Sequence, residues 1–185
     1  MKREGNTIYL YGDNVGKVEL VQAVGSDLSV VNAARVSFGV EKEEIDEKDH
    51  KHTSTLEHCF LTFKFVVPIY VRSQHHRHRT WSYNEISRRY TDVDIQFYEP
   101  ESFRTQHKTN RQASNEELVN PNLSEYRGSP LPVSPQPASD AIKWHHHQSL
   151  ELFNKLLKNG VCREQARGVL PQNLYTQYIG STSLL

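Results

Sequence analysis

The residues most able to do chemistry lie together between positions 72 and 90. These nineteen residues include five arginines, three histidines and a single acid, Glu85, in a chain with no net charge. The planar guanidinium group of arginine pairs with phosphate through two parallel hydrogen bonds, so the cluster predicts a site for a phosphate-bearing ligand. Glu85 has two candidate roles: it organises the arginines through ion pairs, or it accepts a hydrogen bond from a sugar hydroxyl.

A helix from Pro68 to about Arg79 is expected to carry the first half of this cluster, because proline suits the first turn of a helix. Residues three or four apart lie on the same face of a helix. Two sets of side chains would therefore share a face: Gln74, Arg77 and His78 on one side, and Arg72, His76 and Arg79 on another. The second half, residues 82–89, is expected to be a loop whose backbone N–H groups, hydroxyls and arginines suit a phosphate.

The spacing of these residues carries a more specific signal. Residues 77–89 follow the pattern RHRxxSxNxxSxR, which resembles the signature of the flavin-dependent thymidylate synthases. Further blocks are similar to that family: residues 32–37 (NAARVS), residues 52–58 (HTSTLEH), and residues 163–171 (REQARGVLP) followed by Tyr175 and Thr176. The resemblance leaves residues 94–140 unexplained.

The resemblance implies an activity and an assembly. The enzyme would methylate dUMP to dTMP, with methylenetetrahydrofolate as carbon donor, FAD as hydride carrier and NADPH as reductant. The implied fold is α+β, with a small mixed or antiparallel sheet flanked by helices, in a homotetramer whose active sites lie between subunits. Because family members continue past the block that ends in Tyr175 and Thr176, we expect one family domain over residues 1–185 that lacks the family's C-terminal segment.

The resemblance also implies roles for individual residues. The residues implied to bind FAD are Ser54, which would act across a subunit boundary, and Arg77, His78, Arg79 and Glu85. Those implied to bind dUMP are Gln74, Arg77, Glu85, Ile86, Ser87, Arg88, Arg89 and Arg167. Arg167 is also the implied catalytic residue, because a fixed cation facing the uracil carbonyls favours charge that develops on the ring. Ser87 is interpreted as a binding residue, because no histidine and acid are spaced to activate it.

Composition excludes several other classes of protein. Lys and Arg together number 22, as do Asp and Glu, so the chain lacks the overall positive charge of a general nucleic-acid or acidic-membrane binder. The longest apolar run, residues 65–71, is far shorter than the roughly 20 residues of a membrane span, and the N-terminus has no secretory signal. A cytoplasmic location is therefore expected. A hydrophobic content of 36% is low for a monomer, which indicates that oligomerisation or a cofactor completes the core.

Two other readings of the cluster remain open. Arginine interleaved with Trp81, Tyr83 and Tyr90 is also typical of a nucleic-acid-binding module. A catalytically impaired relative that retains flavin or nucleotide binding is the other alternative. Neither the adjacent His75 and His76 nor residues 145–147, three consecutive histidines, predict a metal site, because neighbouring residues on a helix point in different directions. The two cysteines, Cys59 and Cys162, are expected to be reduced structural thiols.

The elements expected to position these groups follow from hydrophobic periodicity and from Gly, Pro and capping residues. Strands are expected at residues 18–24, 58–67 and 91–97. Helices are expected at residues 28–36, 41–51, 112–119, 139–158 and 163–170, the first capped by Ser26 or Asp27 and the long one by Ser139 or Asp140. Five of the eight prolines fall in residues 121–137, which indicates a surface loop.

Overall fold

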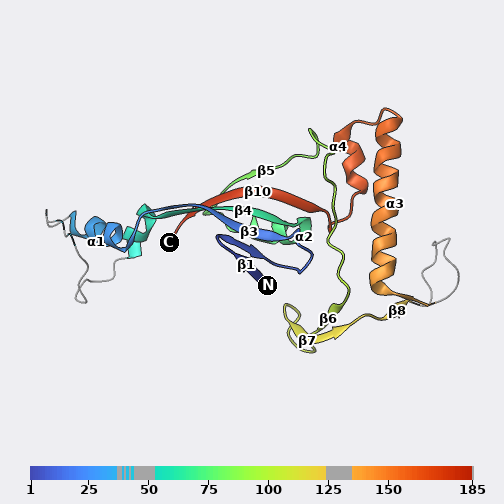
Figure 1. The fold of residues 1–185 in the computed structure, drawn as a ribbon, viewed down its shortest axis with the longest axis horizontal. Helices are drawn as coiled ribbons and strands as arrows, with labels where there is room; N and C mark the ends of the chain where they lie inside the picture. The colour runs from blue at the N-terminus through green and yellow to red at the C-terminus, as the bar shows by residue number, and fades with distance from the viewer. Residues whose placement is uncertain (37–38, 40, 42, 44–52, 124–134, 185) are drawn as a thin grey trace. The chain divides into compact units, whose positions relative to one another are not determined.

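The computed structural model describes residues 1–36, 39, 41, 43, 53–123 and 135–184. The chain forms two compact units (Figure 1). The sheet unit consists of Met1–Ser87 and Tyr175–Leu185, and the helix unit consists of Arg88–Leu174. A single family domain over residues 1–185 stays a prediction.

A six-stranded antiparallel sheet dominates the sheet unit, in the order β1-β2-β3-β4-β10-β5. The strands are β1 (Lys2–Glu4), β2 (Thr7–Tyr9), β3 (Lys17–Val24), β4 (Phe60–Pro68), β5 (Ser82–Glu85) and β10 (Tyr175–Ser183). The predicted strands at residues 18–24 and 58–67 are confirmed as β3 and β4. With the helices described below, this sheet confirms the α+β fold class.

The two longest strands, β4 and β10, pair over their whole length and define the two faces of the sheet. Successive side chains of a strand point to opposite faces, so Phe63 and Phe65 alternate with polar Thr62 and Lys64. Tyr178 of β10 lies opposite Phe65 in the register and stacks on its ring at 4.8 Å. One face of the sheet is therefore aromatic and the other is largely polar.

Among the described residues of the sheet unit, the helical segments are α1 (Asp27–Arg35), the 3-10 helix η2 (Thr53–His58) and α2 (Ile69–His75). Helix α1 begins with a capping box in which Ser26 Oγ accepts from the backbone N–H of Ser29 and Ser29 Oγ accepts from that of Ser26, which confirms Ser26 as its cap. Helix α2 ends at His75, so the prediction that it continues to Arg79 is wrong.

The helix unit contains two β-hairpins and a long helix. Its elements are β6 (Phe103–Gln106), β7 (Ser114–Val119), β8 (Asn122–Leu123), β9 (Gln136–Pro137), α3 (Ala138–Lys158), α4 (Arg163–Ala166) and the 3-10 helix η3 (Arg167–Val169). Helix α3 buries Phe153 and His146 on one face, which confirms the long amphipathic helix. Its predicted caps are wrong: the side chain of Asn120 accepts from the backbone N–H of Ser139 and donates to its hydroxyl.

Three further expectations require correction. The predicted helix at residues 112–119 is wrong, since Ser114–Val119 form strand β7: Gln106 Nε2 donates to the carbonyls of Asn110, Arg111 and Ala113 and so closes a hairpin with β6. Residues 91–97 form no strand beyond an isolated bridge between Phe97 and Leu174, because the backbone turns at Asp94, where φ is 52°. The proline-rich segment begins and ends in the paired strands β8 and β9, and its residues 124–134 lie outside the described residues. Residues 41–51 also lie outside them, apart from Glu41 and Glu43.

Candidate functional site

The cationic motif Arg77-His78-Arg79 occupies a turn that follows α2. The helix ends because Tyr83 folds back from β5 and its hydroxyl donates to the carbonyls of His75 at 2.9 Å and His78 at 3.3 Å. Tyr83 thereby holds the end of α2, where the carbonyl of His75 also accepts from the backbone N–H of His78 at 3.0 Å. The predicted helical face shared by Gln74, Arg77 and His78 is therefore wrong, since Gln74 alone of these three lies within α2.

An aromatic cluster supports this turn from the sheet. His76 stacks on Tyr83 at 3.9 Å, and His75 contacts Phe65 at 4.8 Å and Trp81 at 4.7 Å. His75 Nδ1 shares a 2.8 Å hydrogen bond with the hydroxyl of buried Tyr178. A layer of rings therefore supports the turn, in which the side chains of Arg77, His78 and Arg79 are all exposed.

Gly180 of β10, which has no side chain, lets the aromatic cluster pack against the sheet. A Cβ atom added at Gly180 would lie 3.1 Å from the ring of Trp81 and 3.2 Å from that of Phe65. Both distances are tighter than ordinary van der Waals contact. Glycine at this position therefore allows the Trp81 ring to lie directly on the sheet.

Burial shapes the protonation of this cluster. Burial lowers the pKa of His75, and the neighbouring His78 and His76 lower it further. Burial also lowers the pKa of His76, assisted by Arg72 and opposed by Glu85. The pKa of Tyr178 is raised, chiefly by burial. The aromatic cluster is thus electrically neutral near pH 7, and the positive charge lies on the exposed arginines.

Glu85, at the end of β5, joins three elements of the sheet unit. Its Oε1 atom accepts a hydrogen bond from Arg72 Nε of α2 at 3.0 Å and another from the hydroxyl of Thr176 of β10 at 2.6 Å. Arg72 and Glu85 therefore form an ion pair that is only partly exposed. The sequence left two roles open for Glu85, and this geometry supports the role in which it organises arginine through an ion pair. The second carboxylate oxygen remains for another donor.

The next two residues lead out of β5. The backbone N–H of Ile86 donates to the carbonyl of Gln177 at 2.9 Å, which extends the pairing with β10, while the Ile86 side chain stays partly exposed. Ser87 is half-buried and is the last residue of this part of the sheet unit. The predicted loop at residues 82–89 is therefore a strand in its first half.

The adjacent Arg88 and Arg89 of the helix unit differ sharply in environment. The guanidinium group of Arg88 donates to the carbonyls of Val93 at 2.7 Å and Asp94 at 3.4 Å, and burial lowers its pKa. Arg89 is exposed, with its guanidinium carbon 5.2 Å from the centre of the Tyr90 ring. The side chain of Arg88 thus holds the turn at residues 91–94, whereas that of Arg89 is exposed and donates to the Tyr90 hydroxyl at 3.3 Å.

Arg167, the predicted catalytic residue, is exposed at the junction of α4 and η3. Helix α4 lies beside the turn held by Arg88, because Arg163 forms a 3.2 Å ion pair with Asp92. Within the helix unit, the predicted residues Arg88, Arg89 and Arg167 therefore belong to neighbouring segments.

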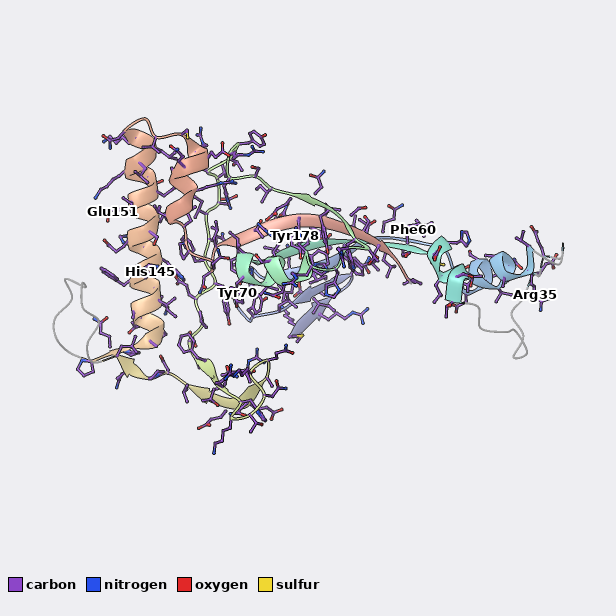
Figure 2. The ribbon with its side chains drawn as sticks, turned by 180° about the vertical axis from the view of Figure 1, so that it is seen from behind. Arg35, Phe60, Tyr70, His145, Glu151 and Tyr178 are labelled. Atoms are coloured by element: carbon purple, nitrogen blue, oxygen red, sulfur yellow. The ribbon has the colours of Figure 1, made fainter. Side chains whose placement is uncertain are left out.

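Ser54 lies away from the other predicted residues of its unit. It is exposed in η2, which precedes β4, whereas α2 and the cationic turn follow β4. Figure 2 shows Phe60 and Tyr70 at the two ends of this strand. The cationic turn is flanked by His75 and Trp81, whose rings contact Phe65 and Phe63 in the middle of β4.

Sequence reasoning missed several residues that shape the site. Arg72 was placed on a helix face but given no partner, and Thr176 was noted only within a family-like block. Tyr83 and Tyr178 received no role, although the alternation of β10 could have placed Tyr178 on the same face as the cluster. In the described residues, no helix has both the length and the hydropathy to cross a membrane, and no group of three His, Cys, Asp or Glu residues is arranged to hold a metal ion.

Comparison with known proteins gives a consistent picture. A family model described as thymidylate synthase complementing protein matches residues 19–184. A flavin-dependent thymidylate synthase from Thermus thermophilus is 38% identical over 171 residues, covering 88% of this chain and 58% of that protein. One from Thermotoga neapolitana is 37% identical over 172 residues, covering 88% of this chain and 68% of that protein. The chain thus spans less than two thirds of the length of the Thermus protein.

A solved structure shares the fold. The UMP/dUMP methylase PolB from Streptomyces cacaoi, crystallised with 5-Br dUMP, superposes with a TM-score of 0.67 at 30% identity. The match covers 95% of this chain and 76% of that chain. It therefore includes most of both the sheet unit and the helix unit.

Proposed function

Because the chain belongs to the thymidylate synthase complementing protein family, we propose that it takes part in flavin-dependent thymidylate synthesis. In this reaction dUMP is methylated to dTMP, with methylenetetrahydrofolate as carbon donor, FAD as hydride carrier and NADPH as reductant. Family membership also agrees with the resemblance carried by residues 77–89. The relatives named as flavin-dependent thymidylate synthases and the UMP/dUMP methylase of similar fold support this reaction.

The observation that carries the proposal is the exposed turn Arg77-His78-Arg79, mounted on the aromatic cluster. Within the described part of the chain, no hydrogen bond or ion pair engages the guanidinium groups of Arg77 and Arg79. The aromatic cluster supports the turn that carries these two guanidinium groups. They suit an anionic cofactor such as FAD, because their orientation is fixed before the ligand binds. We propose that these residues, with His78 and Glu85, hold FAD.

FAD, when bound, supplies hydride-transfer chemistry that protein side chains lack. The chain's own residues bind and orient the nucleotide. We propose that Gln74 and Ile86 line the dUMP site, that Ser87 and Arg89 bind its phosphate, and that Arg77 and Glu85 contact both ligands. Because its guanidinium is committed to Val93 and Asp94, Arg88 would contribute its backbone N–H.

Arg167 has the proposed catalytic role. Its exposed guanidinium would face the uracil carbonyls and stabilise negative charge that develops on the ring, which is the step a fixed cation accelerates most. Its helix is tied by Arg163 to the turn next to Arg89, so the phosphate and the base of one nucleotide would meet neighbouring segments of the helix unit.

The assembly is part of the proposal. We propose that Ser54 and Arg77 reach one FAD from different copies of the chain, as the family resemblance implies. The low hydrophobic content also favours association, and a homotetramer with shared sites meets both conditions. We propose a cytoplasmic location, with no nucleic-acid or membrane partner.

The decisive experiment combines a spectrum with a turnover assay. Purified protein should bind FAD, with oxidised flavin bands at roughly 370 and 450 nm. It should release tritium from 5-tritiated dUMP in the presence of NADPH and methylenetetrahydrofolate. UMP should be assayed in parallel, because the methylase of similar fold is named for both nucleotides.

Each of the two alternative functions predicts a different result in this experiment. Flavin and dUMP binding without tritium release would identify a catalytically impaired relative. Salt-sensitive oligonucleotide binding without bound flavin would identify a nucleic-acid-binding module and overturn the proposal.

A further inference from the structure

We propose that Arg72 and Thr176 are positioning residues that fix the Glu85 carboxylate so that its free oxygen accepts a hydrogen bond from the 3′-hydroxyl of the nucleotide sugar. The inference rests on the proposed function, because it names which part of dUMP the Glu85 position reads. It assigns a role to two residues that the sequence motif does not contain.

The geometry around Glu85 is unusual in its asymmetry. Both donors, Arg72 Nε at 3.0 Å and the Thr176 hydroxyl at 2.6 Å, bind the same atom, Oε1. Within the described residues, no hydrogen bond reaches Oε2. The Glu85 side chain is 23% exposed, so the carboxylate is not sealed inside the sheet unit.

The two partners fix the carboxylate from different sides. Thr176 is buried in β10 and cannot move without disturbing the sheet, whereas Arg72 lies on α2, the helix that also carries Gln74. Together they join β5, α2 and β10 at one atom. A carboxylate held by two donors from rigid elements has one remaining orientation for its free oxygen, and pre-organisation of this kind raises affinity by lowering the cost of ordering.

Stability alone is a poor explanation for this arrangement. The pair is mostly buried, with side chains 29% and 23% exposed, so the cost of removing both charges from water largely cancels their attraction. The effect of the pair on the orientation of the Glu85 carboxylate is not cancelled in this way. The main consequence of the pair is thus the direction in which Oε2 points.

The negative charge of the Glu85 carboxylate determines which part of the nucleotide can lie next to Oε2. A carboxylate repels phosphate and accepts hydrogen bonds from hydroxyl and N–H donors. The residues on either side suit a phosphate better, since Arg77 and Arg89 are exposed cations. In dUMP the 3′-hydroxyl of the sugar is the one hydroxyl outside the phosphate, so it is the O–H donor that suits this carboxylate.

The test compares two nucleotides that differ in one hydroxyl. Isothermal titration of the full chain should be carried out with dUMP and with 2′,3′-dideoxyuridine monophosphate, which lacks the 3′-hydroxyl. Arg72→Met and Thr176→Val should each weaken dUMP binding by about 5- to 20-fold, which is less than the loss of a whole hydrogen bond to a charged group because the carboxylate itself remains. Binding of the dideoxy nucleotide should change less than about twofold.

Two comparisons separate positioning from a general structural effect. In a Glu85→Gln background, Arg72→Met and Thr176→Val should have almost no further effect on dUMP binding, because both act through the carboxylate. Thr176→Ser, which keeps the hydroxyl, should restore affinity. Lys155→Met is the matched control, since it removes the cation of an exposed ion pair with Glu151 on α3 and should leave both nucleotides unaffected.

The outcomes distinguish this inference from the proposed function. Wild-type protein that binds no dUMP would overturn both. Wild-type binding with folded Arg72→Met or Thr176→Val variants that lose neither affinity nor selectivity for the 3′-hydroxyl would overturn only the positioning role. An equal loss of affinity for both nucleotides would also overturn the positioning role. If Arg72→Met fails to fold, Thr176→Val and Thr176→Ser together provide the same test.

Discussion

Adjacent arginines in the cationic motif have opposite environments. Arg88 and Arg89 have the same chemistry and differ by one position, yet the first binds the carbonyls of Val93 and Asp94 and the second lies over the Tyr90 ring in solvent. The Nε atom of Arg88 is buried without a partner among the described residues, a cost that its carbonyl contacts offset. One arginine therefore shapes the loop, and the other presents its charge to solvent, where a ligand can meet it.

Arg89→Ala should weaken dUMP binding by about 1.5 to 3 kcal/mol, because a charge-assisted hydrogen bond to phosphate is lost. FAD content should barely change, since Arg89 is separate from the turn at residues 77–79. Isothermal titration and the flavin absorbance of the purified variant measure the two effects. Arg104→Ala, which removes an exposed arginine of β6, is the control and should alter neither. Equal loss of both ligands would mean that Arg89 maintains the fold.

Buried His146 should make the protein sensitive to acid. It lies in the core of the helix unit with 3% exposure, stacks on Phe97 at 4.7 Å and contacts Glu99 Oε1 at 3.1 Å. Burial lowers its pKa, against the opposing effect of Glu99. The folded state then binds fewer protons than the unfolded chain, so stability is full above the unfolded pKa of about 6.5 and falls as the pH drops below it.

His146→Gln should therefore reduce the fall in melting temperature between about pH 7.5 and about pH 5.5. Some fall should remain, since the pKa values of His75 and His76 are also lowered. Thermal unfolding at both pH values provides the measurement, with His145→Gln as the control because its ring is exposed on the same helix. A wild-type fall that His146→Gln leaves unchanged would show that this histidine does not carry the effect.

At the scale of elements, local sequence predicted those whose periodicity and caps agree with their packing. Strand β4 and helix α3 belong to this group, because their apolar positions repeat at the periods of a strand and a helix. Strand β7 does not: Glu116 and Glu117 favour a helix, and the Gln106 side chain that closes the hairpin acts over several residues. The early end of α2 likewise depends on Tyr83, a residue of the next strand.

The candidate site divides in the same way. The motif alone predicted which residue types the candidate site contains and how they are spaced, because the charge or hydrogen-bonding group of each residue suggests its role. The partners of Glu85 were not readable, since Thr176 is 91 residues away in the sequence and meets it only through the pairing of β5 with β10. Contacts between strands depend on register, which a single sequence specifies poorly.

A hydrogen bond between distant elements should stabilise one end of the sheet. The Tyr175 hydroxyl of β10 donates to Asp13 Oδ2 in the turn between β2 and β3, and Asp13 Oδ1 accepts from the backbone N–H groups of Val15 and Gly16. Burial acts to raise the pKa of Asp13, but these hydrogen bonds outweigh it and the pKa is lowered. The stabilisation is thus present above the unfolded pKa of about 3.9 and lost as the pH falls through the folded value.

Tyr175→Phe should lower the free energy of unfolding by about 1 to 2 kcal/mol at pH 7, and Asp13→Asn by a similar amount. In the double variant the two losses should not add, because both remove the same interaction. Urea unfolding of the four proteins measures the coupling. Fully additive losses would mean that the two side chains stabilise the sheet independently.

At the scale of the whole molecule, the assembly of chains decides how the cofactor site is built. Ser54 belongs to η2, which precedes β4, and the cationic turn is flanked by His75 and Trp81, whose rings contact Phe65 and Phe63 in the middle of β4. The proposed FAD site takes Ser54 from a second copy, as the family resemblance implies, and this assignment can be tested without knowledge of how the two units of a chain are arranged.

Complementation between two defective chains is the last prediction. Ser54→Trp and Arg77→Ala should each abolish most FAD binding when expressed alone, the first by blocking its side of the site and the second by removing a cation. When both chains are co-expressed with different tags and copurified, a site formed by Arg77 of one chain and Ser54 of the other is intact. Random association of two chain types leaves about a quarter of the sites intact, so flavin absorbance should return to roughly that fraction of the wild-type value. Co-expression of two differently tagged Arg77→Ala chains is the control and should recover nothing. If the site lay within one chain, every site in the mixed oligomer would carry a defect, and the absence of recovered flavin would overturn the shared-site assembly.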